Sequence, residues 1–293
     1  MSDIIRITNG VFTASIRPMG AQIVSLTGPD GREIIWQGDP AIWADHTPIL
    51  FPIIGNAKDG QVIIDGKAYP MTKHGFARKA LFRPAVVGEN YVTLELTESD
   101  ETLAQYPFEF TLEITYELTD RGFRCFFTVE NNSDRPMPFC VGGHPAFIVP
   151  MEEGAAFEDY QVIFPVDETV TNLLCPGGQL INGSETLTFP HGVLALDHGI
   201  FDEKDTLLLP DLASSSVDLV HKATGHGLRL SWEGMEALAI WSRPHNHGNY
   251  LCLEPWHGLP GMVDESGVFA EKRYATVLEP EEGYTCHFEA ELI

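Results

Sequence analysis

Positively charged residues are scarce in this sequence. The chain of 293 residues carries 18 lysines and arginines against 42 aspartates and glutamates, which gives a formal net charge of −24 at pH 7. A field of this sign repels nucleic-acid phosphates and anionic lipid headgroups. We therefore expect neither nucleic acid nor a membrane surface as a partner. A neutral small molecule is compatible with the charge, and a local basic pocket could still hold an anion.

Cysteines are few and scattered. No two of the five form a CxxC pair, and their number is odd; they are Cys125, Cys140, Cys175, Cys252 and Cys286. This pattern argues against a disulfide framework and against a structural zinc site. We expect buried free thiols, and Cys252, which lies within an apolar run, is expected to be inert.

Long apolar runs and leader signatures are also missing. The sequence contains no stretch of 18 apolar residues, and residues 1–6 show no basic segment followed by an apolar run. The first absence predicts no transmembrane helix, and the second predicts no secretory signal. We therefore expect a cytoplasmic protein.

Helix signals are weak, and the dominant period of the sequence is two. Apolar and polar residues alternate through residues 108–118 and again through residues 284–292, as in half-buried strands. Further strands are predicted at residues 4–7, 12–17, 22–26, 61–64, 91–96, 123–130, 216–221, 227–232, 237–241 and 250–253. One short helix is expected at residues 99–105, with Ser99 or Asp100 as its N-cap. Asp65-Gly66 is expected to form a tight hairpin turn.

The chain shows no internal repeat, no low-complexity tract and no linker. This organisation predicts a single all-β domain over residues 1–293, largely antiparallel and with few short helices. Strands this numerous must close into a barrel or stack in two sheets, because their apolar faces and edges need cover.

Glu254 is the first candidate for chemistry. It follows the apolar run 250–253 and precedes Pro255-Trp256. A carboxyl group in such surroundings is partly desolvated, which raises its pKa and makes it a better base near neutral pH. The alternative is a glutamate at a strand end that faces water.

His144 is the second candidate. It stands between Gly142-Gly143 and Pro145, in a turn that would present its side chain rigidly. Histidine exchanges protons near neutrality. The alternative is a turn histidine that is hydrogen-bonded to the backbone.

His74 and Arg78 lie four residues apart around Gly75-Phe76-Ala77. In a loop they could converge on one ligand, to which arginine would offer a flat fork of donors. The alternative is a capping histidine and a surface arginine.

Other catalytic signatures are missing or incomplete. The sequence has no GxSxG, no phosphate-binding GxxxxGK[ST], no GxGxxG between strand and helix and no HExxH. His245-Asn246-His247 resembles a metal-binding pair, but six residues separate His247 from Glu254. A cupin-like metal site would want a glutamate three or four residues on, so we predict a polar loop and no metal site.

Four motifs together resemble a known family. They are LFPIIGNAKDG at 50–60, HGFAR at 74–78, GGHPAF at 142–147 and CLEPWHG at 252–258. In this order and spacing they resemble the aldose 1-epimerase (galactose mutarotase-like) superfamily, and within it the LacX-like bacterial subgroup. Each motif alone is modest, but the set is specific and the similarity covers nearly the whole chain. The resemblance implies a galactose mutarotase-like β-supersandwich with the sugar site in a cleft on one sheet.

The resemblance also implies roles for single residues. Glu254 matches the catalytic base of the family, and His144 matches its catalytic acid. His74 resembles a second active-site histidine, and Arg78 a substrate-binding arginine. The substrate-binding aspartate is expected at Asp205, with Asp202 as the alternative.

Asn56 departs from the family pattern, because relatives often carry arginine at this position. Asparagine can hydrogen-bond a hydroxyl group but is a poor match for an anionic one. We include Asn56 among the expected substrate-binding residues. Trp256 is also expected to bind substrate, and an aromatic residue is expected to stack on the sugar; the candidates are Trp36, Phe76, Trp241 and Trp256.

The implied function is that of an aldose 1-epimerase, an isomerase that interconverts the α and β anomers of a hexose. Glu254 would take the proton from O1, and a protonated His144 would give one to the ring oxygen O5, so no cofactor and no metal are required. Three alternatives remain: a hexose-phosphate 1-epimerase, a non-catalytic carbohydrate-binding protein and a cupin-like metal isomerase. The first would need clustered cations, for which the candidates are Lys58, Lys73, Arg78 and Lys79. The sequence leaves open the sugar and the oligomeric state.

Overall fold

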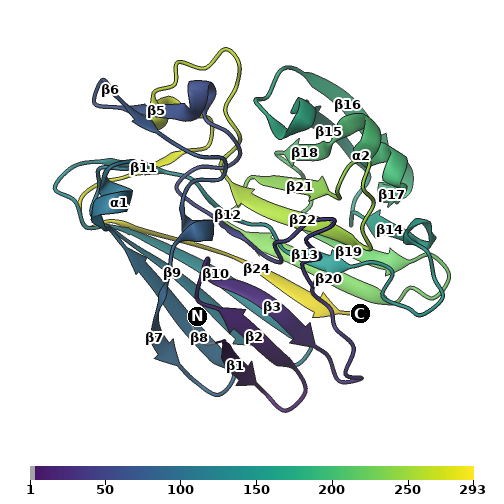
Figure 1. Ribbon diagram of the computed structural model, residues 1–293. Coiled ribbons are helices and arrows are strands. Elements are labelled where there is room, and N and C mark those ends of the chain that lie inside the picture. The colour runs from purple at the N-terminus through teal and green to yellow at the C-terminus, as the bar shows by residue number, and fades with distance from the viewer. Residues whose placement is uncertain (1–3) are drawn as a thin grey trace.

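The computed structural model describes residues 4–293, and every pairing between its named strands that is given below is antiparallel (Figure 1). Met1–Asp3, which begin the segment inspected for a leader, lie outside the described residues. Over residues 4–293, no helix is both long and apolar enough to cross a membrane.

The largest sheet has nine strands. In spatial order they are β17 (Val193–Ala195), β14 (Tyr160–Ile163), β19 (Ser216–His221), β20 (Gly227–Glu233), β24 (Gly283–Leu292), β10 (Gly122–Asn131), β9 (Phe110–Leu118), β8 (Tyr91–Thr97) and β7 (Arg83–Val87). Along β9 buried and half-buried side chains alternate at every residue. The period of two in the sequence therefore reflects a sheet with one face on the core.

A second sheet of six strands carries the candidate residue Glu254. Its order is β18 (Thr206–Pro210), β21 (Ala237–Trp241), β22 (Tyr250–His257), β12 (Val141–Gly143) and β4 (Ile49–Leu50), and β13 (Ala146–Ile148) also pairs with β22. All eight residues of β22 are buried. A strand covered on both faces loses its polar alternation, which explains the apolar run that precedes Glu254.

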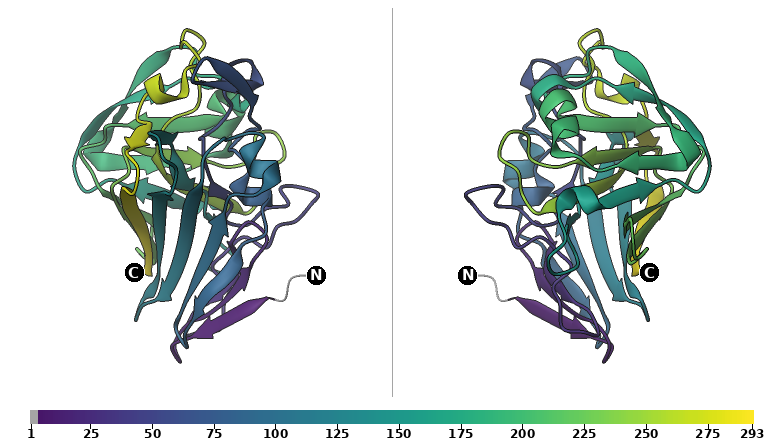
Figure 2. Two further views of the ribbon diagram at one scale, coloured as in Figure 1. Left: turned by 90° about the vertical axis from the view of Figure 1, so that its left-hand side faces the viewer. Right: turned by 90° about the vertical axis from the view of Figure 1, so that its right-hand side faces the viewer.

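Smaller sheets complete the fold. They are β1 (Ile5–Thr8) with β2 (Thr13–Arg17) and β3 (Gln22–Thr27), and the pairs β5 (Gln61–Ile64) with β6 (Lys67–Pro70), β11 (Met137–Phe139) with β23 (Thr276–Leu278), and β15 (Glu168–Leu173) with β16 (Ser184–Phe189). The β1–β3 sheet lies beside the β7–β8 end of the nine-stranded sheet, where the Thr8 amide donates to the Glu89 carbonyl (Figure 2). Asp65 and Gly66 have φ of 50° and 75°, so the predicted tight turn between β5 and β6 is confirmed.

Two short α-helices are present in the described residues. The helix α1 (Asp100–Leu103) begins after Ser99, whose hydroxyl accepts a hydrogen bond from the Thr102 amide in a capping box, so this prediction is confirmed. The helix α2 (His198–Lys204) is not predicted from the sequence. Single 3₁₀ turns lie at Lys58–Gly60, Ala77–Lys79, Phe157–Asp159, Pro176–Gly178, Pro190–Gly192 and Phe269–Glu271.

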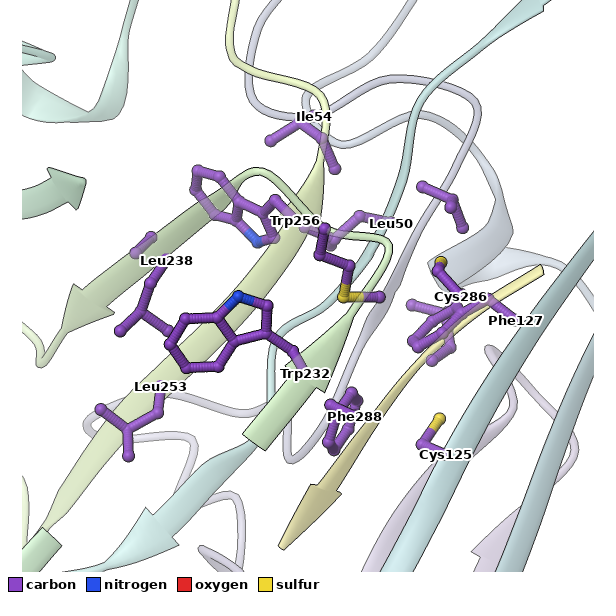
Figure 3. Close-up of a cluster of buried hydrophobic side chains, with 14 of the residues drawn as sticks. Leu50, Ile54, Cys125, Phe127, Trp232, Leu238, Leu253, Trp256, Cys286 and Phe288 are labelled. Carbon is purple, nitrogen blue, oxygen red and sulfur yellow. The ribbon is translucent and has the colours of Figure 1, made fainter. Parts of the chain in front are cut away.

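The hydrophobic core lies where the two large sheets face each other. Leu253 and Trp256 of β22, Trp232 of β20 and Phe288 of β24 belong to one buried cluster (Figure 3). The sheets approach so closely at Gly143 that an added Cβ would lie 2.7 Å from the Phe288 ring. The all-β, largely antiparallel fold predicted from the sequence is confirmed. All five cysteines are buried and free, as expected.

Candidate active site

A cavity of about 380 Å³ opens on the six-stranded sheet. This volume lies in the range of small-molecule sites. The four sequence motifs meet there, because Gly55, His74, His144 and Glu254 each come from a different one and all line the cavity. The motifs are thus parts of one site.

Glu254 lies in the floor of the cavity. Cys252, Glu254 and Trp256 are alternate residues of β22 and share one face of the strand. Glu254 is only 1% exposed, which rules out a glutamate that faces water. Burial raises the pKa of its carboxyl group well above the usual value, the charge of Lys73 lowers that pKa, and Asp205 adds to the rise.

His144 is placed opposite Glu254 by the pairing of strands. Gly142 pairs with Trp256 and Ala146 with Cys252, so the turn that joins β12 to β13 carries His144 over the middle of β22. The His144 Nε2 and Glu254 Oε2 atoms are 3.2 Å apart. The ring of Trp43 stacks on the imidazole at a centroid distance of 5.1 Å, and Trp241 meets it edge-on at 5.7 Å.

The buried environment shifts the pKa values of His144 and Glu254 in opposite directions. Burial, together with the charges of Arg78 and Lys73, lowers the pKa of His144 to about 3. Burial raises the pKa of Glu254. Burial therefore favours the protonated form of Glu254 and the neutral form of His144. This differs from the expectation that His144 enters as a free cation, because that expectation ignored desolvation.

His74 joins two of the motifs. The Gly55 amide donates to its Nδ1 atom at 3.0 Å, so the neutral ring carries its proton on Nε2 and offers a donor. Burial lowers the pKa of His74 well below the usual value. His74 and Gly75 have φ of 64° and 69°, and a Cβ on Gly75 would lie 2.1 Å from the Phe51 carbonyl oxygen. The glycine of the HGFAR motif is therefore required by close backbone packing.

Arg78 lies on the 3₁₀ turn Ala77–Lys79 and lines the cavity. Its Nη2 atom is 2.5 Å from Asp45 Oδ2, and both side chains are about one quarter exposed. The carboxylate holds the planar guanidinium at the rim. Arg78 thus lies in the cavity lining, unlike the alternative of a surface arginine.

Of the two candidate aspartates, Asp205 is the one in the cavity. It follows the last turn of α2 in a strained backbone conformation with φ of 63°. Asp202 accepts from the His245 amide at 2.6 Å and lies 3.0 Å from His247 Nε2. His245 and His247 therefore belong to a polar loop joined to α2.

Asn56 does not line the cavity. Its side-chain amide donates to the Gly178 carbonyl at 2.9 Å, and Gly177 and Gly178, both with positive φ, do line the cavity. The structure thus places Asn56 behind the wall, where it supports the 3₁₀ turn Pro176–Gly178, instead of facing a substrate as expected.

Trp256 and Trp241 line the cavity, whereas Trp36 and Phe76 do not. The indole Nε1 of Trp256 is buried and has no hydrogen-bond partner among residues 4–293. The same holds for Glu254 Oε2, which is near His144 but not aligned for a hydrogen bond, and for His144 Nδ1. Three buried polar atoms without partners at one cavity indicate a site built for a polar ligand.

Several lining residues are not among the predicted ones: Trp43, Cys175, Gly177, Gly178 and Arg243. Trp43 lies in an irregular segment without any periodic signal. Arg243 comes two residues after the predicted strand 237–241, next to a proline, and this position at a strand end is the only signal that could have identified it.

A buried group with metal-ligand chemistry overlaps the site. Ligand atoms of His144, Cys252 and Glu254 all lie within 4.8 Å of one another. Two of the three would have to lose a proton to bind a cation. Burial raises the pKa of both the Cys252 thiol and the Glu254 carboxyl, so this environment opposes metal binding.

Comparisons with known proteins identify the family of the chain. Residues 3–290 match the family model described as aldose 1-epimerase. The chain is 32% identical over 285 residues to the plasmid-encoded protein LacX of Lactococcus lactis subsp. lactis, which covers 94% of this chain and 95% of that protein.

Solved structures give the same result. A galactose mutarotase related enzyme from Lactobacillus acidophilus superimposes with a TM-score of 0.94 at 28% identity, covering 99% of this chain and 97% of the other. A galactose mutarotase-like protein from Lactobacillus casei has a TM-score of 0.92 at 31% identity, covering 99% and 100%. The galactose mutarotase-like fold is thereby confirmed. The motifs, the fold and the family match agree along the chain, which belongs to the aldose 1-epimerase family.

Proposed function

We propose that this protein is an aldose 1-epimerase that interconverts the α and β anomers of a hexose. The observation that carries the proposal is the pair His144–Glu254, 3.2 Å apart in the floor of a cavity. Anomer exchange needs one group that takes a proton and one that gives a proton on the same substrate. The family membership supports a sugar as that substrate.

The proposed reaction opens and recloses the hemiacetal ring. Glu254 takes the proton of the O1 hydroxyl, and His144 delivers a proton to O5 as the C1–O5 bond breaks. Rotation about the C1–C2 bond presents the other face of the aldehyde, and the reverse transfers close the ring and restore both groups. Each positioned acid or base contributes roughly 10²–10⁴-fold.

The shared proton of the pair fits this reaction. Burial favours protonated Glu254 and neutral His144, so Glu254 must pass its proton to His144 before it acts as a base. We propose that substrate binding drives this transfer, because hydroxyl groups that donate to Glu254 stabilise its carboxylate. The charge of Lys73 also lowers the pKa of Glu254 and so favours its carboxylate form.

The remaining lining residues would orient the sugar. His74 offers its Nε2 proton, Arg78 its guanidinium and Asp205 its carboxylate to hydroxyl groups. Trp256 offers an unpartnered indole N–H. Trp43 and Trp241 line the cavity, and both rings contact the imidazole of His144. We propose that these two rings pack on the apolar face of the sugar.

A non-catalytic carbohydrate-binding protein is the main alternative. Such a protein has no need of a buried carboxyl group next to a desolvated imidazole, and burying both costs stability. We also propose that the protein acts in the cytoplasm, where its five free buried cysteines would stay reduced.

Polarimetry tests the proposal directly. Freshly dissolved α-glucose and α-galactose should reach anomeric equilibrium faster with catalytic amounts of the protein than in buffer. Binding of either sugar without any acceleration would support the carbohydrate-binding alternative.

A further inference from the structure

The charge of the cavity differs from the charge of the chain. Over the whole sequence acidic residues outnumber basic ones 42 to 18. In the cavity lining the order is reversed, with Lys73, Arg78 and Arg243 against Asp205 and Glu254. Since burial favours the neutral form of Glu254, the three cations face a single carboxylate inside the cavity.

The counter-ions of these cations can be traced. Arg78 is paired with Asp45. Among residues 4–293, neither Lys73 nor Arg243 has a carboxylate oxygen within 4.0 Å. Asp205 and Lys73 both lie close to Gly178: a Cβ built on Gly178 would lie 2.6 Å from Lys73 Nζ and 3.8 Å from Asp205 Oδ1. The charge of Arg78 is compensated by Asp45, and the carboxylate of Asp205 can compensate the charge of Lys73. The charge of Arg243 is therefore left without a counter-ion in the cavity lining.

Lys73 carries its charge into the cavity, although the residue is exposed. Its ammonium lowers the pKa of His74 and His144 and opposes the rise of the Glu254 pKa. The ammonium packs against Gly178, where a larger residue would displace it, and the Asn56 amide holds the Gly178 carbonyl. Asn56, which replaces a cation common in relatives, thus helps to position another cation.

Burial orders the site from floor to mouth. Glu254 is buried in the floor, whereas Lys73 and Arg243 are exposed residues at the mouth. A sugar whose anomeric carbon lies between Glu254 and His144 would extend its other substituents toward the mouth. Of the other cations expected from the sequence, Lys58 donates to the Glu265 carbonyl and Lys79 lines a separate cavity, so neither serves this end.

We propose that the substrate is an anionic hexose derivative, whose phosphate or carboxylate group is held by Lys73 and Arg243 at the mouth of the cavity. This inference rests on the proposed function and specifies its substrate class. The anion supplies the negative charge that the lining lacks, and hydrogen bonds from charged donors are stronger than those between neutral groups.

The test compares anomer exchange of glucose, glucose 6-phosphate and glucuronate by NMR saturation transfer at matched ionic strength, each above its rate in buffer. The same comparison is made in the galactose series. We expect kcat/KM for one of the charged sugars to exceed that of the parent by about tenfold or more. The charged sugar with the larger increase in kcat/KM shows whether the site prefers phosphate or carboxylate. This increase should become smaller as salt is added. Equal or lower kcat/KM for both charged sugars would overturn the inference and leave the proposed function intact.

Variants locate the effect. Lys73→Met and Arg243→Gln should each lower the ratio of charged to neutral kcat/KM by about tenfold. Lys79→Met is the matched control, because Lys79 is a nearby lysine that faces another cavity, and it should leave the ratio unchanged. If neither Lys73→Met nor Arg243→Gln changed the ratio of charged to neutral kcat/KM, the assignment of Lys73 and Arg243 as the anion-binding residues would be contradicted. If no sugar is accelerated, the proposed function fails, and calorimetric titration decides the inference separately: tighter binding of a charged sugar supports it, and equal binding overturns it.

Discussion

The Nε2 atom of His144 lies 3.2 Å from the Oε2 atom of Glu254, although the two residues come from distant parts of the chain. The imidazole is supplied by the turn after β12, and the carboxyl group by the middle of β22. Burial lowers the pKa of the histidine and raises the pKa of the glutamate. We propose that the two groups act as one unit in proton transfer.

Replacement of the proposed base tests that unit. Glu254→Gln keeps the shape of the side chain and removes its ability to accept a proton. We expect kcat to fall about 10²–10⁴-fold, with little change in sugar binding or in thermal unfolding, since a neutral amide suits a buried site. Polarimetry, calorimetric titration and a thermal melt measure the three quantities. A variant as active as the parent protein would end the assignment.

The effects of replacing His144 and Glu254 on kcat should not be additive. His144→Asn is expected to lower kcat by about 10²–10⁴-fold. Because each group needs the other to complete proton transfer, the double variant with Glu254→Gln should be only slightly slower than the slower single variant. Losses that multiply fully in the double variant would show that the residues act independently.

The pH dependence of activity should reflect the desolvated pair. A second proton is added to His144 only near its pKa of about 3, and the shared proton leaves only above the usual range of a carboxyl group, because the pKa of Glu254 is raised. We therefore expect kcat/KM to change by less than about twofold between about pH 7 and pH 5. An inflection near pH 6.5, where a solvated histidine titrates, would contradict this view of the site.

Asn56 should act on the cavity through the turn behind it. Asn56→Ala removes the hydrogen bond to the Gly178 carbonyl and leaves Gly177-Gly178 less well held. A net hydrogen bond contributes about 1 kcal/mol, so we expect KM to rise up to about fivefold while kcat stays nearly constant. Steady-state kinetics separates the two constants. A fall in kcat with unchanged KM would contradict this indirect role.

Metal removal should leave the activity unchanged. His144, Cys252 and Glu254 come close enough to be considered as ligands, but burial raises the pKa of both the Cys252 thiol and the Glu254 carboxyl and so favours their protonated forms, which bind cations poorly. Dialysis against a chelator and the variant Cys252→Ser should each retain most of kcat. A metal isomerase would be favoured if the dialysed protein and the Cys252→Ser variant both lost activity, and if added zinc restored the activity of the dialysed protein but not that of the variant.

Much of the fold could be predicted because local patterns coincide with single elements. Each of the strands predicted from period two or from an apolar run corresponds to a strand, from β1 to β24. Among the missed strands, β7, β15, β16 and β18 have five or six residues, whereas β4, β12 and β13 have only two or three. Such short segments have no period to detect, and they exist because longer neighbours such as β22 offer them hydrogen bonds.

The candidate site was only partly predictable, for a related reason. His74, Arg78, His144, Glu254 and Trp256 stand in motifs and line the cavity. Asn56 stands in a motif too, yet its amide points at the Gly178 carbonyl behind the wall. A motif records that a residue matters, but not whether it faces the ligand or a neighbouring carbonyl group.

The sequence by itself determined the period-two strands, the glycines that close backbone packing requires, and the residue types available for proton transfer, because these depend on local geometry and chemistry. Only the tertiary structure decided the directions in which the pKa values of His144 and Glu254 shift, the presence of Asp205 and not Asp202 in the cavity lining, and the reversal of charge in the cavity. These properties arise from burial and from through-space distances between segments that are remote in the chain, and neither quantity can be read from the order of residues.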